Sequence, residues 1–363
     1  MEEDEREVIP TDRDLIRRPQ TVSADWAQAM LARNGHVADV LDVTVEPVGT
    51  GQLGDTVRMT LTYGARQGPG TIIGKFAATS EASRQIASNW RLYEREVGFY
   101  RYLAEKARVA TAGCYASVLD EGSFVLLLED CAPARPGDQI AGIAVPAAHA
   151  AIREAARLHS AFWDCGDNPD LAWLETGPLA QPFYDASIIR SAWPQFSDRY
   201  ADMLTDDMKR VCDAFVERYE AYSRPLSSPR CITHNDFRPD NMLFWPDGQI
   251  RIVDWQSAAL GHNAVDISYL IGGAFSPDDR RDVEQALLDT YHEELAEQGV
   301  DCSRAELAED YRHFTFAGMN VAVGAAMMVG RTERGDRMFL TMLGRHVAHV
   351  LDTGALSILD ERF

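Results

Sequence analysis

The sequence lacks several features that would place it in a specialised class of proteins. Its six cysteines are scattered without C-x-x-C spacing, which argues against a zinc site and a disulfide framework and favours reduced thiols. The N-terminus starts with acidic residues instead of a basic segment and an apolar run, so no secretory signal is visible. The longest apolar stretch, 314–329, contains Asn320 and two glycines and is short for a membrane span. We therefore expect a cytoplasmic protein with no membrane association, in which this stretch is a buried helix.

Basic residues are scarce relative to acidic ones. The chain has 35 Lys and Arg against 56 Asp and Glu, which gives a formal net charge of -21. A charge of this sign repels nucleic acid and anionic lipid at long range, so neither is expected as a partner. An acidic surface that keeps the protein soluble is a sufficient explanation of the excess.

The length and the hydrophobic content predict more than one lobe. At 363 residues, of which 46% are hydrophobic, the chain exceeds the size at which a single core stops growing. Strand-like patterns recur up to about residue 130, and helical periodicity dominates after the breakers Pro133, Pro136 and Gly137. We predict an acidic tail at 1–20, a first lobe at 21–130 and a second lobe at 131–363.

The first lobe is predicted to contain two helices and five strands. Thr21 or Ser23 can cap a helix that ends at Asn34-Gly35, and a second helix is predicted at 83–106. Alternation of apolar and polar residues predicts strands at 41–48, 57–63 and 71–77, and strand-like patterns return at 115–119 and 124–128.

The strongest functional signal is the segment 234–241, His-Asn-Asp-Phe-Arg-Pro-Asp-Asn, which is followed by an apolar run, a turn and Asp254. The carboxylate of Asp236 can orient or deprotonate an attacking hydroxyl group. The amide of Asn241 and the carboxylate of Asp254 supply hard oxygen ligands for Mg²⁺. The turn residues 246–248 fold the two halves of the motif together. This combination suits phosphoryl transfer.

The same segment resembles the catalytic loop of the protein-kinase-like superfamily, H-x-D-x-x-x-x-N, which is followed by a metal-binding Asp. The resemblance implies that Asp236 is the catalytic base and that Asn241 and Asp254 are the metal ligands. Arg238 stands where protein kinases usually carry a Lys that contacts the transferred phosphate. His234 matches the first residue of the motif, whose role is mainly structural.

A glycine-rich turn precedes this motif in the order that the superfamily requires. Gly49, Gly51 and Gly54 lie between two predicted strands. Glycine tolerates positive φ and lets backbone N–H groups approach phosphate oxygens. The turn of an ordinary hairpin is the alternative interpretation.

Two more elements complete the predicted nucleotide site. Lys75 lies on a mostly apolar predicted strand, where it can bridge the α- and β-phosphates while a helix carboxylate holds it. Glu96 is our first choice for that carboxylate and Glu94 the second. Glu129 and Cys131 follow an apolar run at the position where the superfamily offers backbone groups to adenine.

Shorter motifs are similar to the aminoglycoside phosphotransferase and choline kinase group, nearest its ecdysteroid kinase-like branch. They are Glu-Val-Gly-Phe-Tyr at 96–100, Leu-Glu-Asp at 128–130, Leu-His-Ser-Ala-Phe-Trp at 158–163 and Val-Asp-Trp-Gln at 253–256. The resemblance implies an α+β, bilobal protein-kinase-like fold with a small antiparallel-sheet N-lobe and a larger, mainly helical C-lobe. It also implies an ATP- and Mg²⁺-dependent kinase that phosphorylates a hydroxyl of a small molecule, such as an aminoglycoside, an amino alcohol, a sugar or a sterol-like alcohol.

Alternatives stay open at this point. A protein kinase needs a long activation segment, but here Asp254 is followed by Asp266 within a dozen residues. A catalytically inactive nucleotide-binding scaffold would need a degraded motif, and this motif is complete.

The roles of three further features also stay open. Asp266 can brace the catalytic loop or satisfy donors at a helix N-terminus. We interpret His159 as a core histidine, and the aromatic segment 166–200 as either part of the acceptor pocket or packing.

Overall fold

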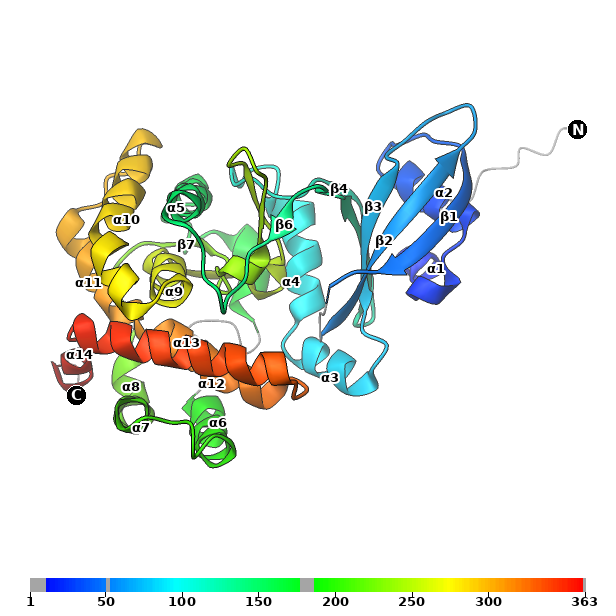
Figure 1. Ribbon diagram of the computed structural model, residues 1–363. Helices are drawn as coiled ribbons and strands as arrows, with labels where there is room; N and C mark the ends of the chain where they lie inside the picture. The colour runs from blue at the N-terminus through cyan, green and yellow to red at the C-terminus, as the bar shows by residue number, and fades with distance from the viewer. Residues whose placement is uncertain (1–10, 50–52, 177–185, 362–363) are drawn as a thin grey trace, which may run out of the picture. The chain divides into compact units, whose positions relative to one another are not determined.

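The computed structural model describes residues 11–49, 53–176 and 186–361 (Figure 1). The chain divides into two compact units, the first formed by Met1–Arg101 and Ala112–Cys131 and the second by Tyr102–Thr111 and Ala132–Phe363. The sequence-based division placed all of 21–130 in one lobe. The short segment Tyr102–Thr111 instead packs with the second unit, because Thr111 forms a bridge with Ile252 there.

The first unit is built on an antiparallel five-stranded sheet with strand order β1-β2-β3-β5-β4. Its strands are β1 Val40–Pro47, β2 Gly54–Tyr63, β3 Thr71–Ala77, β4 Cys114–Asp120 and β5 Ser123–Glu129. All five were predicted, to within a few residues at each end. In β3 the buried side chains of Ile72 and Phe76 alternate with Lys75, which therefore lies on the opposite face of the strand.

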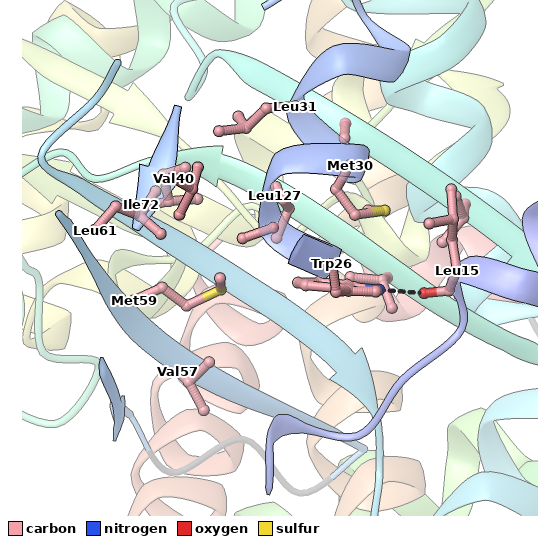
Figure 2. Close-up of a cluster of buried hydrophobic side chains, with 14 of the residues drawn as sticks. Leu15, Trp26, Met30, Leu31, Val40, Val57, Met59, Leu61, Ile72 and Leu127 are labelled. Carbon is pink, nitrogen blue, oxygen red and sulfur yellow. Dashed lines mark hydrogen bonds between the residues drawn. The ribbon is translucent and has the colours of Figure 1, made fainter. Parts of the chain in front are cut away.

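Helix α2, Ala24–Arg33, supplies the apolar layer that covers one face of this sheet. It begins where predicted, because the Ser23 hydroxyl accepts a hydrogen bond from the Trp26 backbone N–H. Trp26 and Met30 lie on its buried face and pack with Met59 and other strand residues in one hydrophobic cluster (Figure 2).

The predicted acidic tail is too long. Residues Asp12–Leu15 form the short helix α1, and Pro19–Thr21 form a 3₁₀ turn. Leu15 is buried in the cluster with Trp26, and its carbonyl oxygen accepts a hydrogen bond of 2.8 Å from the indole N–H (Figure 2). Leu15 therefore anchors this segment to the hydrophobic cluster, although the charged residues around it had suggested a solvated tail.

The helix predicted at 83–106 is interrupted. The structure has α3 Glu81–Asn89, α4 Leu92–Gly98 and a π-helical turn, Phe99–Leu103. Arg91, at the break, has a left-handed φ of 56°. An L-residue in that conformation cannot continue a right-handed helix, so α4 starts in a new direction.

The second unit is mainly helical, as expected. Its helices are α5 Val145–Ala161, α6 Ala186–Arg199, α7 Asp206–Glu217, α8 Tyr219–Tyr222, α9 Ala264–Ala274, α10 Pro277–Glu297, α11 Arg304–Phe314, α12 Phe316–Met328, α13 Glu333–Asp352 and α14 Leu356–Glu361. Two small sheets, β6-β8-β9 and β10-β7, use the strands β6 Arg135–Pro136, β7 Arg230–Thr233, β8 Met242–Phe244, β9 Ile250–Ile252 and β10 Ala259–His262.

Helix α12 is the long apolar stretch of the sequence, and it is a buried helix rather than a membrane span. None of the helices in the described part of the chain combines the length and the apolar character needed to cross a bilayer. Gly318 of α12 lets α13 approach closely. A Cβ added at Gly318 would lie 2.1 Å from the ring of the buried His346 of α13.

We expect Gly318→Ala to lower the free energy of unfolding by about 1–3 kcal/mol, because the added methyl group overlaps a ring that has no room to move. Gly324→Ala is the matched control on the same helix, since nothing lies within 4 Å of its added Cβ. That change should be neutral or stabilising through helix propensity. Thermal denaturation of both variants measures the difference, and equal midpoints would contradict the close approach.

Candidate active site

The β8–β9 hairpin places two predicted metal ligands at the same end. Met242 of β8 pairs with Ile252 of β9, and the Val253 N–H donates to the carbonyl oxygen of Asn241 at 3.0 Å. Asp254 follows directly, with a left-handed φ of 70° that redirects the chain at the end of the strand. Asn241 and Asp254 are therefore neighbours across the hairpin, as their spacing predicted.

The carboxylate of Asp236 is held by three donors. Its Oδ1 accepts from Arg238 Nε at 2.9 Å and from the Tyr269 hydroxyl at 3.0 Å. Its Oδ2 accepts from Asn241 Nδ2 at 2.7 Å. Because the amide nitrogen of Asn241 faces Asp236, its amide oxygen points away from that carboxylate and is available as a ligand.

Arg238 joins two carboxylates of the predicted catalytic loop. Its Nη1 donates to Asp240 Oδ2 at 3.0 Å and lies 3.4 Å from the sulfur of Met338. Burial alone would lower the pKa of Arg238, but the charge of Asp236, with those of Asp240 and Asp254, raises it. Arg238 therefore stays cationic beside Asp236, the predicted base, although part of its guanidinium is committed to Asp236 and Asp240.

Helix α9 braces the predicted catalytic loop through Asp266. The Asp266 carboxylate is fully buried and accepts the backbone N–H groups of His234 at 2.7 Å and Asn235 at 2.8 Å. Two interpretations were left open for Asp266, and these hydrogen bonds show that it braces the loop. His159 lies 3.1 Å from Asp266 and 2.7 Å from the Tyr291 hydroxyl, so it is a hydrogen-bonded core histidine, as expected.

His234 connects the loop to the hairpin. Its Nδ1 accepts the backbone N–H of Asp236 at 3.3 Å, so its Nε2 carries the proton and donates to the Val253 carbonyl at 3.0 Å. The ring also packs against Trp255, with centroids 4.7 Å apart. These contacts tie the backbone at Asp236 to the end of β9.

In the first unit Lys75 forms an ion pair with Glu96 of α4. Glu96 is 2% exposed and Lys75 17% exposed, so the pair is shielded from water. Glu94 instead pairs with Arg91 at the break between α3 and α4. Glu96, the first of the two candidates, is thus the carboxylate that holds Lys75.

The predicted glycine turn is described only in part. Gly49 ends the segment after β1 with a φ of +76°, which other residues rarely adopt, and Gly54 is the first residue of β2. A Cβ added at Gly54 would lie 3.2 Å from the Phe76 carbonyl oxygen. Gly51 lies outside the described residues.

One backbone group of the predicted adenine segment is already engaged within the first unit. The backbone N–H of Glu129 donates to the Gly113 carbonyl at 2.7 Å, so it is not available to a nucleotide. The Glu129 side chain accepts the Gly113 N–H at 3.1 Å, and the Cys131 thiol lies 3.8 Å from the Glu129 carbonyl oxygen. Any backbone donor to adenine must therefore come from a residue other than Glu129.

Sequence reasoning missed Tyr269, whose hydroxyl contacts Asp236 from α9. It lies in an apolar helical stretch that reads as ordinary core. The only signal was its position three residues after Asp266, which places both side chains on one face of a helix.

The chain was compared with known proteins. Residues 53–303 match the model of the ecdysteroid kinase-like family. No curated protein matched in sequence. Among solved structures, a choline kinase from Cryptosporidium parvum Iowa II has 11% identity and a TM-score of 0.53, over 88% of this chain and 90% of that one. An ethanolamine kinase from Plasmodium vivax has 13% identity and a TM-score of 0.54, over 86% and 84%. These likenesses confirm the predicted fold class.

Proposed function

The chain belongs to the ecdysteroid kinase-like family, and from this membership and its site geometry we propose that it transfers the γ-phosphoryl group of ATP to a hydroxyl of a small molecule. The observation that carries the proposal is the environment of Asp236. Asp236 is oriented by Asn241, Arg238 and Tyr269 at the end of the hairpin that also bears Asp254. A base next to two hard oxygen ligands is the arrangement that this reaction requires.

The residues present fit a magnesium ion. Asn241 turns its amide nitrogen toward Asp236 and leaves its oxygen free to coordinate, and Asp254 supplies a carboxylate. Mg²⁺ usually takes one or two such protein ligands and completes its shell with phosphate oxygens and water. Bound there, the ion would neutralise charge on the phosphate oxygens of the nucleotide.

The protein's own residues then divide the work. Asp236 holds the acceptor hydroxyl and takes its proton, while Arg238 keeps a positive charge beside the loop for the transferred phosphate. In the first unit, Lys75 holds the α- and β-phosphates with Glu96 fixing it, and the turn at Gly49 and Gly54 offers backbone N–H groups.

A small acceptor is favoured over a protein. Strand β10 starts at Ala259, soon after Asp254, and α9 begins at Ala264. No room is left there for the activation segment with which protein kinases bind peptides. The solved neighbours named as choline and ethanolamine kinases agree with a small acceptor.

The second candidate function, an inactive nucleotide-binding scaffold, is disfavoured because Lys75, Asp236, Asn241 and Asp254 are all present.

A substrate screen tests the proposal. The protein is incubated with ATP and Mg²⁺ and with aminoglycosides, choline-like amino alcohols, sugars or sterol-like alcohols in turn. We expect one class to accelerate ADP release and to gain one phosphoryl group by mass spectrometry, and EDTA to abolish both signals. Absence of any phosphorylated product, together with no Mg²⁺-dependent ATP binding, would overturn the proposal.

A further inference from the structure

Tyr269 contacts the predicted catalytic base from a helix that already supports the loop. Its side chain is 2% exposed, and its hydroxyl donates to Asp236 Oδ1 at 3.0 Å. Asp266, one helical turn earlier on α9, holds the backbone N–H groups of His234 and Asn235. One face of α9 therefore fixes both the backbone of the loop and the carboxylate that the loop presents.

The Tyr269 ring cannot easily leave this position. It lies against the fully buried ring of His346 on α13, with centroids 5.5 Å apart. His346 is itself confined, since a Cβ added at Gly272 would lie 2.7 Å from its Nδ1 and one added at Gly318 would lie 2.1 Å from its ring. Because His346 has no room to move, the Tyr269 ring is held in place and its hydroxyl stays directed at Asp236.

The hydrogen bonds distinguish the two oxygens of Asp236. Each carboxylate oxygen can accept about two hydrogen bonds. Oδ1 accepts two, from Arg238 and Tyr269, whereas Oδ2 accepts one from a side chain, that of Asn241. Among the described residues, the remaining acceptor position is therefore on Oδ2, the oxygen next to the predicted metal ligand Asn241.

We propose that Tyr269 is a positioning residue that saturates Oδ1 and directs the acceptor hydroxyl to Oδ2. This inference rests on the proposed function. In the step, the hydroxyl proton moves to Oδ2 as the acceptor oxygen bonds to the γ-phosphorus. The bond from that phosphorus to the β–γ bridging oxygen breaks, ADP leaves with its electron pair, and Asp236 later releases the proton to water.

The test compares two buried tyrosines whose hydroxyl groups donate to different carboxylates. Tyr269→Phe removes the bond to Asp236, and Tyr311→Phe, the control, removes a partly buried bond of 2.6 Å to Glu284, away from the loop. ADP release is measured with Mg²⁺·ATP alone, where water is the acceptor, and with each alcohol of the screen. We expect kcat of Tyr269→Phe to fall about 10-fold, the equivalent of one hydrogen bond to a charged group, with KM for ATP unchanged. Tyr311→Phe should keep the wild-type kcat.

A double-mutant cycle separates positioning from general damage. In an Asp236→Ala background there is no carboxylate to orient, so adding Tyr269→Phe should cause no further loss of kcat. Equal losses in Tyr269→Phe and Tyr311→Phe, or full additivity with Asp236→Ala, would overturn the role of Tyr269 alone. Wild-type turnover in Asp236→Ala would overturn this inference alone, because there would be no base to position. No turnover by the wild type would overturn the proposed function and this inference with it.

Discussion

Replacing Asp236 with alanine should lower kcat by about 10² to 10⁴-fold, the usual contribution of a general base. Without the Asp236 carboxylate, the loop would have no oxygen to accept the proton of the acceptor hydroxyl. The backbone should hold its shape, because His234 and Asn235 are fixed by Asp266 rather than by Asp236. Steady-state kinetics with the best acceptor, and calorimetric titration with Mg²⁺·ATP, measure the two effects separately.

Asp236→Asn sharpens this prediction. The amide nearly matches the carboxylate in shape, and its oxygen can still accept from Arg238 or Tyr269, but it cannot take a proton at neutral pH. We expect both variants to lose turnover to a similar extent and to bind Mg²⁺·ATP like the wild type. Turnover restored by Asn would show that Asp236 only orients the acceptor, and wild-type turnover in Ala would remove it from the mechanism.

The β8–β9 hairpin could be predicted because its geometry is local. One antiparallel pairing, Met242 with Ile252, is enough to bring Asn241 and Asp254 together. Residue types and spacing along some twenty residues therefore encode the arrangement. The same holds for the strands of the first unit, where apolar alternation is set by the two faces of a sheet.

The choice between Glu94 and Glu96 could not be made from the sequence. Two residues apart, they differ by about 200° around a helix, so only one can face Lys75. Which one does so depends on the direction of α4, and the left-handed Arg91 sets that direction. The pattern of apolar and polar residues in the sequence does not reveal a positive φ at an arginine.

Long-range contacts explain the other misses. Tyr269 reaches Asp236 across 33 residues of chain, and Leu15 packs with Trp26 although its neighbours are charged. Neither contact follows from periodicity, because an apolar side chain in a helix reads as core whatever it touches. The proposed acceptor could not be predicted for a related reason, since a fold constrains the type of reaction far more than it constrains the pocket that would select an acceptor.

Replacing Asp254 with alanine should have the second large effect, on nucleotide binding rather than on proton transfer. Loss of even an outer partner of a metal commonly costs 10–100-fold in affinity, so loss of a direct ligand should weaken Mg²⁺-dependent ATP binding by about 100-fold or more. Binding measured in EDTA should change little, because Asp254 would then contribute only a negative charge near the phosphates.

The matched control for this change is Asp247→Asn, at the exposed turn of the same hairpin. It removes one negative charge and keeps an oxygen that can accept the Gln249 N–H, as Asp247 does at 3.1 Å. If Asp254 is a metal ligand, calorimetric titrations will show a large loss for Asp254→Ala in Mg²⁺ and none for Asp247→Asn. Equal affinities in the two variants would mean that Asp254 acts through charge or turn geometry alone, and the metal would then have to be held elsewhere.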